Sequence, residues 1–327
     1  MHILLLGGTR FLGKYIAQIA LTRGHDVTCL ARGTSAPVAG TRFVKADRDE
    51  DDGLEAVSGE RWDVVIDLAV HPEHARRAAN GLNAAHAIFV STGSVYAEQT
   101  AINSETDELV TGLDQPKMSD MQQYPCAKAS CEKEYSAAFD QLTIIRPGLI
   151  GGYGDETGRC GYYPWRFANP TGPEVVVPDP SFPVAILDAE DLATWIVICA
   201  EERITGEFNA AGEPTTLAEV VEISRQLAAN DVQARVVNND VLLEHEVAPW
   251  MGPESLPLWL PDPALRNVAL LESELARSHK LTTRPLAETL AAGLRYEQDR
   301  QTPRHAGLSD EKEREILAAH TRRAMSG

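Results

Sequence analysis

The sequence lacks an apolar run long enough to cross a membrane. A spanning helix needs about 18 apolar residues, and the nearest approach, residues 186–200, is interrupted by Asp188, Glu190 and Asp191. The first apolar run, Ile3–Leu6, follows no basic segment and ends at two glycines. We therefore expect neither a membrane span nor a secretory signal.

Cysteine is also scarce. The five cysteines are an odd number and show no paired metal-ligand spacing. They are Cys29, Cys126, Cys131, Cys160 and Cys199. We expect reduced, buried thiols, no metal site and a cytoplasmic protein.

Lys and Arg are also few in comparison with Asp and Glu. Lys and Arg number 30 against 48 Asp and Glu, which gives a net charge of −18. This balance argues against sequence-independent binding to nucleic acid or to an anionic membrane. We expect a small molecule as the partner and leave a homodimer open.

Apolar β-rich runs alternate with helical patterns in the first half of the chain. Strands are expected at His2–Leu6, Val27–Leu30, Arg42–Val44, Asp63–Leu68, Ala87–Ser91 and Leu142–Arg146, and helices at Phe11–Thr22, Pro72–Asn83 and Tyr124–Phe139. Buried strands that alternate with helices predict an α/β fold, with a doubly wound parallel sheet of the Rossmann type.

A glycine-rich turn joins the first strand to the first helix. Glycines let the backbone approach a pyrophosphate, and a helix N-terminus supplies unsatisfied N–H groups. The turn predicts a dinucleotide site, although a plain chain reversal would use the same residues. The candidate cofactor-binding residues are Gly7, Gly8, Thr9, Arg10, Phe11, Leu12 and Gly13.

The second strand ends at Arg32 without the acid that usually accepts hydrogen bonds from the ribose of NAD. An arginine can instead pair with a 2′-phosphate. We therefore expect NADP(H) as the preferred cofactor and NAD(H) as the weaker one, with Arg10 as a second contact. A solvated surface arginine is the plain alternative.

Four motifs together resemble the extended short-chain dehydrogenase/reductases, or their extended-like atypical relatives, in the NAD-dependent epimerase/dehydratase family. They are Gly7–Gly13, Ser91–Tyr96, Tyr124–Lys128 and Arg146–Gly148. Further landmarks at Ile186–Ala193 and Gly206–Asn209 extend the likeness to residues 1–300, so that the final helix lies outside it. Arg10 stands where the family has a glycine, and Gly93 and Ser94 stand where its sugar-nucleotide dehydratases have Asp-Glu.

Tyr124 and Lys128 are four residues apart, so a helix would place them on one face. A nearby ammonium favours the phenolate, which can exchange a proton with substrate as hydride moves. The resemblance implies that Lys128 also holds the nicotinamide ribose and that Thr92 hydrogen-bonds the reacting oxygen. It further implies that Asp47 contacts adenine. The plainer alternatives are a surface pair for Tyr124 and Lys128, an ordinary turn residue for Thr92, and a helix cap for Asp47.

The segment after Pro147 is rich in glycine, proline and aromatics. We expect residues 154–166 to form a loop over the nicotinamide end, although these aromatics could equally pack the loop onto the sheet. The candidate substrate residues are His71, Arg159, Tyr162, Tyr163, Trp165 and Arg166. The predicted domains are a dinucleotide-binding domain at 1–165, an α/β substrate lobe at 166–300, partly interleaved with the first, and a peripheral C-terminal helix within 301–327.

These features predict an NADP(H)-dependent reductase or dehydrogenase acting on a carbonyl or secondary alcohol, with Tyr124 as the general acid/base. A nucleotide-sugar epimerase with a tightly bound cofactor is the first alternative. The second is a non-catalytic dinucleotide sensor or RNA-binding relative. Retention of Thr92, Tyr124 and Lys128, together with the acidic charge, disfavours this last reading.

Overall fold

The protein was analysed as a computed structural model that describes residues 1–326, with side chains up to residue 323. The described residues form two compact units. The first comprises residues 1–148, 189–211 and 271–282, and the second comprises 149–188, 212–270 and 283–327. This division differs from the predicted one, because the chain returns twice to the first unit and the C-terminal helix belongs to the second.

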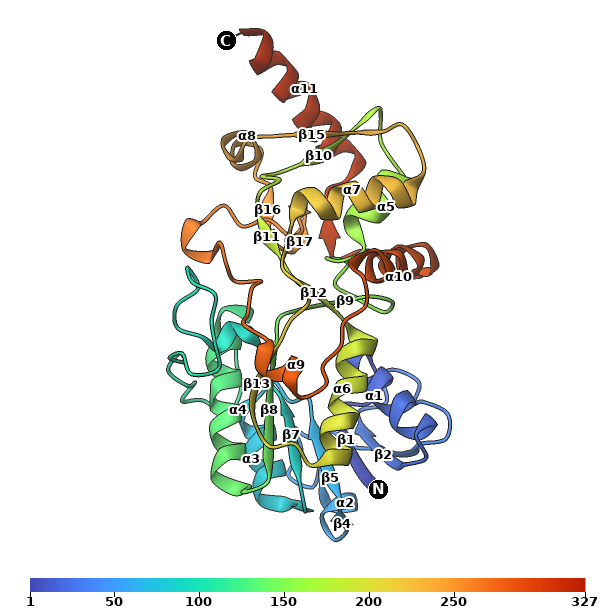
Figure 1. Cartoon of the computed structure of the whole chain (residues 1–327), viewed down its shortest axis with the longest axis vertical. Helices are drawn as coiled ribbons and strands as arrows, with labels where there is room; N and C mark the ends of the chain where they lie inside the picture. The colour runs from blue at the N-terminus through green and yellow to red at the C-terminus, as the bar shows by residue number, and fades with distance from the viewer. Residues whose placement is uncertain (327) are drawn as a thin grey trace. The chain divides into compact units, whose positions relative to one another are not determined.

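Within the described residues, the first unit contains a seven-stranded parallel sheet in the order β13-β8-β7-β5-β1-β2-β3 (Figure 1). The strands are β1 (His2–Leu6), β2 (Asp26–Ala31), β3 (Arg42–Lys45), β5 (Val64–Asp67), β7 (Ala87–Val90), β8 (Leu142–Pro147) and β13 (Gly206–Ala210). The predicted strands and the doubly wound α/β fold are therefore confirmed.

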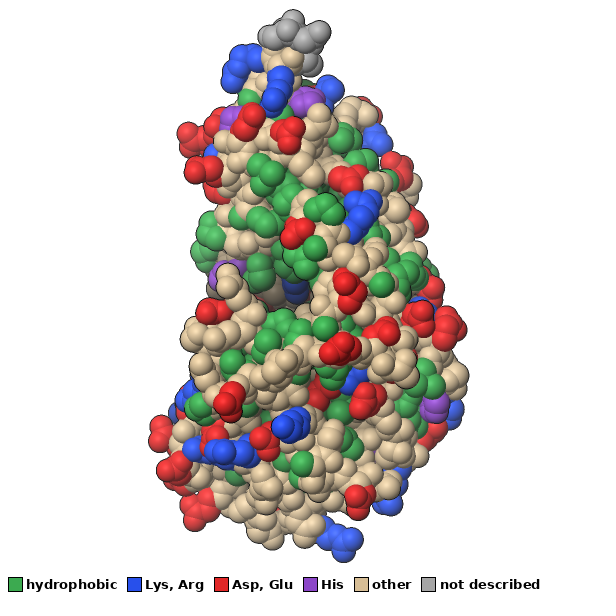
Figure 2. Space-filling view, turned by 90° about the vertical axis from the view of Figure 1, so that its left-hand side faces the viewer, with side chains coloured by type: hydrophobic (Ala, Val, Ile, Leu, Met, Phe, Trp, Pro, Cys, Tyr) green, Lys and Arg blue, Asp and Glu red, His purple; other side chains and the backbone are tan. Residues whose placement is uncertain are grey.

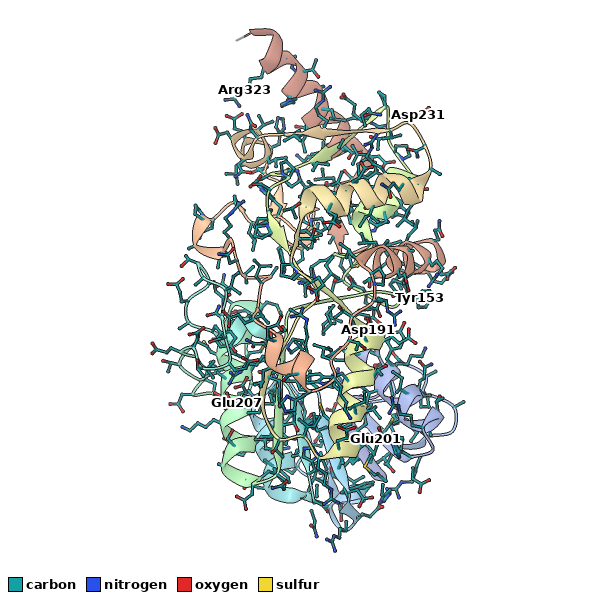
Figure 3. All side chains as sticks on the ribbon, viewed as in Figure 1. Tyr153, Asp191, Glu201, Glu207, Asp231 and Arg323 are labelled. Atoms are coloured by element: carbon teal, nitrogen blue, oxygen red, sulfur yellow. The ribbon has the colours of Figure 1, made fainter. Side chains whose placement is uncertain are left out.

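Helices cover both faces of this sheet, as its buried strands require. Helices α1 (Phe11–Thr22) and α6 (Ala189–Glu202) pack together on one face, and α3 (Pro72–Gly81) and α4 (Tyr124–Ala138) on the other (Figure 1). On α6, Glu201 (labelled in Figure 3) accepts a hydrogen bond from Arg23 Nη1 at 2.6 Å and pairs with His25 Nε2 at 2.8 Å. These contacts tie the returning helix to the N-terminal βα unit.

The second unit is built from short strands and helices around its own apolar core. Its parallel pairs are β9 (Leu149–Gly151) with β12 (Ile186–Asp188) and β10 (Glu174–Val177) with β15 (Gln233–Val236). Its main helices are α5 (Tyr162–Ala168), α7 (Leu217–Ala228), α10 (Leu286–Asp299) and α11 (Asp310–Ser326). The α5 helix begins inside the segment that the sequence predicts as a loop.

Shorter elements complete both units. In the first unit they are α2 (Glu55–Ser58), β4 (Arg61–Trp62), β6 (Asn83–Ala84), the 3₁₀ turns η1 (Gly93–Val95) and η2 (Met121–Gln123), and α9 (Glu274–Ser278). In the second they are β11 (Pro183–Val184), β14 (Thr215–Thr216), α8 (Asn239–Glu244), β16 (Ala248–Pro249), β17 (Gly252–Pro253), β18 (Ser255–Leu256), the 3₁₀ turn η3 (Pro263–Leu265) and β19 (Ala306–Gly307).

Two further properties follow from the described part of the chain. None of its helices is long and apolar enough to span a membrane. Across the same residues, no cluster of three or more His, Cys, Asp or Glu side chains is arranged to hold a metal ion.

Candidate active site

The predicted cofactor and catalytic residues of the first unit gather at the carboxyl edge of its sheet. The glycine turn follows β1, Arg32 follows β2, Asp47 follows β3, His71 follows β5 and Thr92 follows β7. Parallel strands place their carboxyl ends along one edge, where ligands bind in doubly wound folds. The sheet order therefore brings together residues that lie far apart in the sequence.

Each glycine of the first turn is required for its own reason. Gly7 has a φ of +108°, which only glycine adopts readily. A Cβ at Gly8 would lie 2.6 Å from Cys29 Sγ, and one at Gly13 would lie 2.3 Å from the carbonyl oxygen of Gly7. The N-terminus of α1 thus packs directly onto the turn, as a close helix–strand junction for a pyrophosphate needs. Arg10 occupies the N-cap of this helix.

The ends of β2 and β3 are adjacent and carry polar side chains. Arg32 is exposed, and the next residue, Gly33, has a φ of +78° and lies beside Lys45, whose side chain would be 3.5 Å from a Cβ at this position. Asp47 Oδ1 accepts a hydrogen bond from the Asp49 main chain at 3.1 Å. Two cationic side chains therefore border the place where a 2′-phosphate is predicted to bind.

Thr92 begins the 3₁₀ turn Gly93–Val95. Its hydroxyl lies 2.8 Å from the Ser94 hydroxyl and accepts a hydrogen bond from the Ser94 main chain at 3.3 Å. Helix α4, which begins at Tyr124, packs against this turn. The helix that carries Tyr124 and Lys128 therefore lies beside Thr92.

Lys128 is deeply buried and holds two main-chain carbonyls. Its Nζ donates to Ala69 at 2.7 Å and to Val90 at 2.5 Å, at the carboxyl ends of β5 and β7. The ammonium also lies 4.4 Å from the centre of the Phe89 ring. Burial lowers the pKa of Lys128 to about 8, against opposing electrostatic effects of Cys131 and Asp67.

A buried ion pair that the sequence analysis missed lies next to Lys128. Asp67, fully buried, accepts hydrogen bonds from Arg48 Nη1 at 2.7 Å and Nη2 at 2.8 Å. It also accepts from the Ala69 main chain at 2.8 Å and from the Tyr135 hydroxyl at 2.6 Å. Burial, followed by the charge of Asp67, raises the pKa of Tyr135, so this hydroxyl stays protonated.

A second buried network supports β8 and β13. Arg146 donates to Glu132 Oε2 at 2.8 Å and to Glu207 Oε2 at 2.6 Å (Glu207 is labelled in Figure 3). Tyr96 donates to Asn209 at 2.7 Å and accepts from Arg146 at 3.2 Å. The Arg146 motif of the family resemblance thus has a structural role here.

His71 lies at the N-cap of α3, with its ring 5.3 Å from the ring of His74. Burial lowers the pKa of His71, and its Nδ1 has no hydrogen-bond partner among the described residues. A neutral imidazole at this strand end remains a candidate ligand-binding group.

In the second unit, Arg159 and Trp165 are half-buried. Arg159 Nε donates to Thr157 Oγ1 at 3.2 Å, and its guanidinium lies 5.4 Å from the Trp250 ring. Trp165 stacks under the guanidinium of Arg304 at 3.6 Å. Both remain candidate substrate residues within this unit.

Tyr162, Tyr163 and Arg166 lie in the core of the second unit, contrary to the expectation that they line a pocket. Both tyrosine rings are fully buried. The Arg166 guanidinium donates to Asp310 at 2.7 Å and to the Leu308 carbonyl at 2.5 Å, so the C-terminal segment already occupies it. The plainer reading, in which these side chains pack the segment, describes them better.

Acidic and basic side chains are interspersed on the molecular face drawn in Figure 2. This distribution fits the acidic net charge of −18.

Comparison with known families and sequences gives two matches. Residues 3–211 match the model of the NAD dependent epimerase/dehydratase family. A stretch of 239 residues is 27% identical to the chloroplast stem-loop binding protein of 41 kDa b from Arabidopsis thaliana, and it covers 64% of this chain and 58% of that protein. The match therefore spans less than two thirds of the relative's own length.

Solved structures resemble this chain in fold. A putative epimerase from Burkholderia cenocepacia is 19% identical with a TM-score of 0.68, over 91% of this chain and 98% of its own. UDP-glucuronic acid 4-epimerase from Bacillus cereus in complex with NAD is 14% identical with a TM-score of 0.67, over 91% and 99%. At these identities the likeness is one of fold.

Proposed function

Because this chain belongs to the NAD dependent epimerase/dehydratase family, we propose that it transfers hydride at a hydroxyl-bearing carbon of a small molecule. The observation that carries the proposal is the buried ammonium of Lys128, fixed at the ends of β5 and β7 on the helix of Tyr124. The strand–turn–helix junction fits a dinucleotide, because a Cβ at Gly8 or Gly13 would collide with Cys29 or with the carbonyl oxygen of Gly7 and force α1 away from the turn.

The residues have distinct roles in this proposal. The Tyr124 phenolate takes the proton of the substrate hydroxyl and returns it in the reverse direction. Lys128 favours that phenolate by its charge and donates its remaining N–H to a ribose hydroxyl. Thr92 hydrogen-bonds the reacting oxygen. When bound, the nicotinamide ring supplies the acceptor or donor of the hydride.

Epimerisation of a nucleotide sugar is the overall reaction we favour. The family description and the epimerases of similar fold support it. A free-standing NADP(H)-dependent reductase shares the first hydride step and is the second candidate, supported by Arg32 at the end of β2. The two reactions differ in whether the hydride returns to the same substrate.

A panel of UDP-sugars and carbonyl compounds distinguishes these reactions. The epimerase should purify with bound cofactor visible by absorbance and should interconvert sugar epimers, detected by NMR, without net consumption of cofactor. The reductase should consume NADPH stoichiometrically with a carbonyl substrate. The absence of both activities across the whole panel would contradict the proposal.

Tyr124→Phe tests the catalytic assignment. Removal of the phenol should lower turnover by about 10²–10⁴-fold, the usual contribution of general acid–base catalysis, while cofactor affinity changes little. Tyr153→Phe is the matched control, since it removes an exposed phenol that donates to Asp299 in the second unit and has no role in the proposal. Unchanged turnover in Tyr124→Phe would refute the role of Tyr124.

RNA binding is the alternative from another class, since the name of the Arabidopsis relative describes stem-loop binding. The net charge of −18 works against the phosphate contacts that supply such affinity. We propose that nucleic acid is not a partner. A salt-sensitive complex with a stem-loop RNA, seen by mobility shift, would contradict this.

A further inference from the structure

The carboxylate of Asp67 is hydrogen-bonded to Ala69, which accepts from Lys128, and to Tyr135, which lies on the helix of Lys128. The Ala69 main-chain N–H donates to Asp67 Oδ1, and the carbonyl of the same residue accepts from Lys128. Tyr135, on the same helix as Lys128, donates to Asp67 Oδ2. The residue that accepts from Lys128 and the helix that carries Lys128 are therefore both hydrogen-bonded to Asp67.

The same carboxylate also reaches the segment that follows β3. Arg48, the neighbour of Asp47 in the sequence, donates hydrogen bonds from both terminal nitrogens to the carboxylate of Asp67. Its Nη2 also donates to the His74 carbonyl at 2.6 Å, which links α3 to this cluster. A bidentate pair of this kind is the strong and well-oriented arrangement of an arginine with a carboxylate. It holds Arg48, and therefore the backbone next to Asp47, in place.

The ring of Phe89 packs against both Tyr135 and Lys128 and limits their movement. Phe89 stacks on Tyr135 with ring centres 5.1 Å apart and planes 20° apart, while the Lys128 ammonium lies over the same ring. Buried side chains packed in this way have little freedom to rearrange. A displacement of the Tyr135 ring would therefore shift the Phe89 ring and, with it, the position of the Lys128 ammonium.

We propose that Asp67 is a positioning residue for the dinucleotide: through Ala69 and Tyr135 it sets the place and charge of Lys128, and through Arg48 it sets the segment that carries Asp47. The inference rests on the proposed function. The side chains of Asp67, Arg48 and Tyr135 themselves need not touch the cofactor or the substrate.

The first test is Asp67→Asn in the full chain, with two measurements. The midpoint of Lys128 titration, followed by NMR of labelled lysine without cofactor, should fall by about one unit because a neighbouring negative charge is lost. In the wild type, NADPH affinity should decrease as pH rises through about 8, where Lys128 loses its proton. In Asp67→Asn this decrease should begin at lower pH, with affinity about fivefold weaker at the wild-type midpoint, where the protonated fraction of Lys128 falls from about one half to about one eleventh.

A milder variant covers the case in which Asp67→Asn does not fold. Tyr135→Phe removes one hydrogen bond to Asp67 and should weaken NADPH binding about threefold, as for the loss of one buried hydrogen bond. Tyr96→Phe is the matched control, since Tyr96 is equally buried in the same unit and donates to Asn209. It should lower Tm at least as much, because it also removes the hydrogen bond from Arg146, and it should leave NADPH affinity unchanged.

Two results would overturn the inference. One is an unchanged Lys128 midpoint in Asp67→Asn, and the other is equal NADPH affinity in Tyr135→Phe and Tyr96→Phe. A wild type that binds neither NADPH nor NADH would refute the proposed function instead. The Lys128 midpoint, measured without cofactor, would still decide the role of Asp67.

Discussion

At Gly13, the Cβ of any other residue would lie 2.3 Å from the carbonyl oxygen of Gly7. Because that neighbour is backbone, the helix must move away from the turn. Gly13→Ala should therefore destabilise the protein by about 1–3 kcal/mol, as overpacking does, and should weaken dinucleotide binding. Denaturant unfolding and a cofactor titration measure the two effects.

Gly81 provides the control for this change. It ends α3 with helical geometry, and a Cβ there would meet no atom within 4 Å. Gly81→Ala should stabilise the protein by about 0.4–1 kcal/mol through the unfolded chain. Equal behaviour of the two alanine variants would contradict the packing account of the turn.

Arg32 is the residue on which the cofactor preference depends. Its removal in Arg32→Ala should weaken NADPH binding by about tenfold, since hydrogen bonds to charged groups contribute about 1.5–3 kcal/mol when buried and less when exposed. NADH, which has no 2′-phosphate, should bind as before. Fluorescence titration with both cofactors measures the ratio, and a parallel loss of both affinities would count against the 2′-phosphate contact.

At the residue scale, the sequence displays patterns whose parts are close together along the chain, and it does not display contacts between distant residues. The glycine turn and the Tyr124–Lys128 spacing are readable because their parts adjoin in the sequence. The Asp67 cluster joins residues 48, 67 and 135, and no local pattern indicates that these side chains meet.

At the scale of elements, helices and strands with strong periodicity were predicted almost residue for residue. Strand β1 and helix α1 have the predicted bounds, because an apolar strand, a glycine turn and a helix with a C-terminal glycine are all local signals. Helix α5, only seven residues long, was missed among glycines, prolines and aromatics. Its stability comes from tertiary packing in the second unit, which the sequence does not display.

The packing of the C-terminal helix was also predicted wrongly from the sequence. The sequence predicts peripheral packing, but Glu313 is fully buried and accepts hydrogen bonds from Thr171 at 2.8 Å and from the Val176 main chain at 3.1 Å. Arg166 lies 3.6 Å from the same carboxylate. Helix α11 is therefore anchored in the second unit by a buried acid.

Glu313→Ala should destabilise the protein by about 3–5 kcal/mol, because it leaves buried Arg166 with only part of its countercharge. Glu311→Ala, at an exposed position of the same helix, should change stability by no more than about 0.5 kcal/mol. Thermal unfolding of both variants measures the difference. Similar unfolding midpoints would mean that α11 contributes little to the second unit.

At the scale of the molecule, the sequence predicted two α/β regions but not how the chain is shared between them. Residues 189–211 return to the first unit, where β13 pairs with β8. Periodicity identifies β13 as a strand, but it does not reveal which strand lies beside it. Pairing between distant segments is decided by tertiary packing, which is why the predicted boundary at residue 165 differs from the observed division.

The central claim is that the carboxyl edge of the sheet binds a nicotinamide dinucleotide. Equilibrium fluorescence titration with NADPH and NADH tests it most directly, on the full chain freed of any cofactor that co-purifies with it. The account predicts saturable binding, tighter for NADPH, and weakened by Gly13→Ala but not by Gly81→Ala. Absence of saturable binding by either cofactor, or binding that Gly13→Ala leaves untouched, would contradict it.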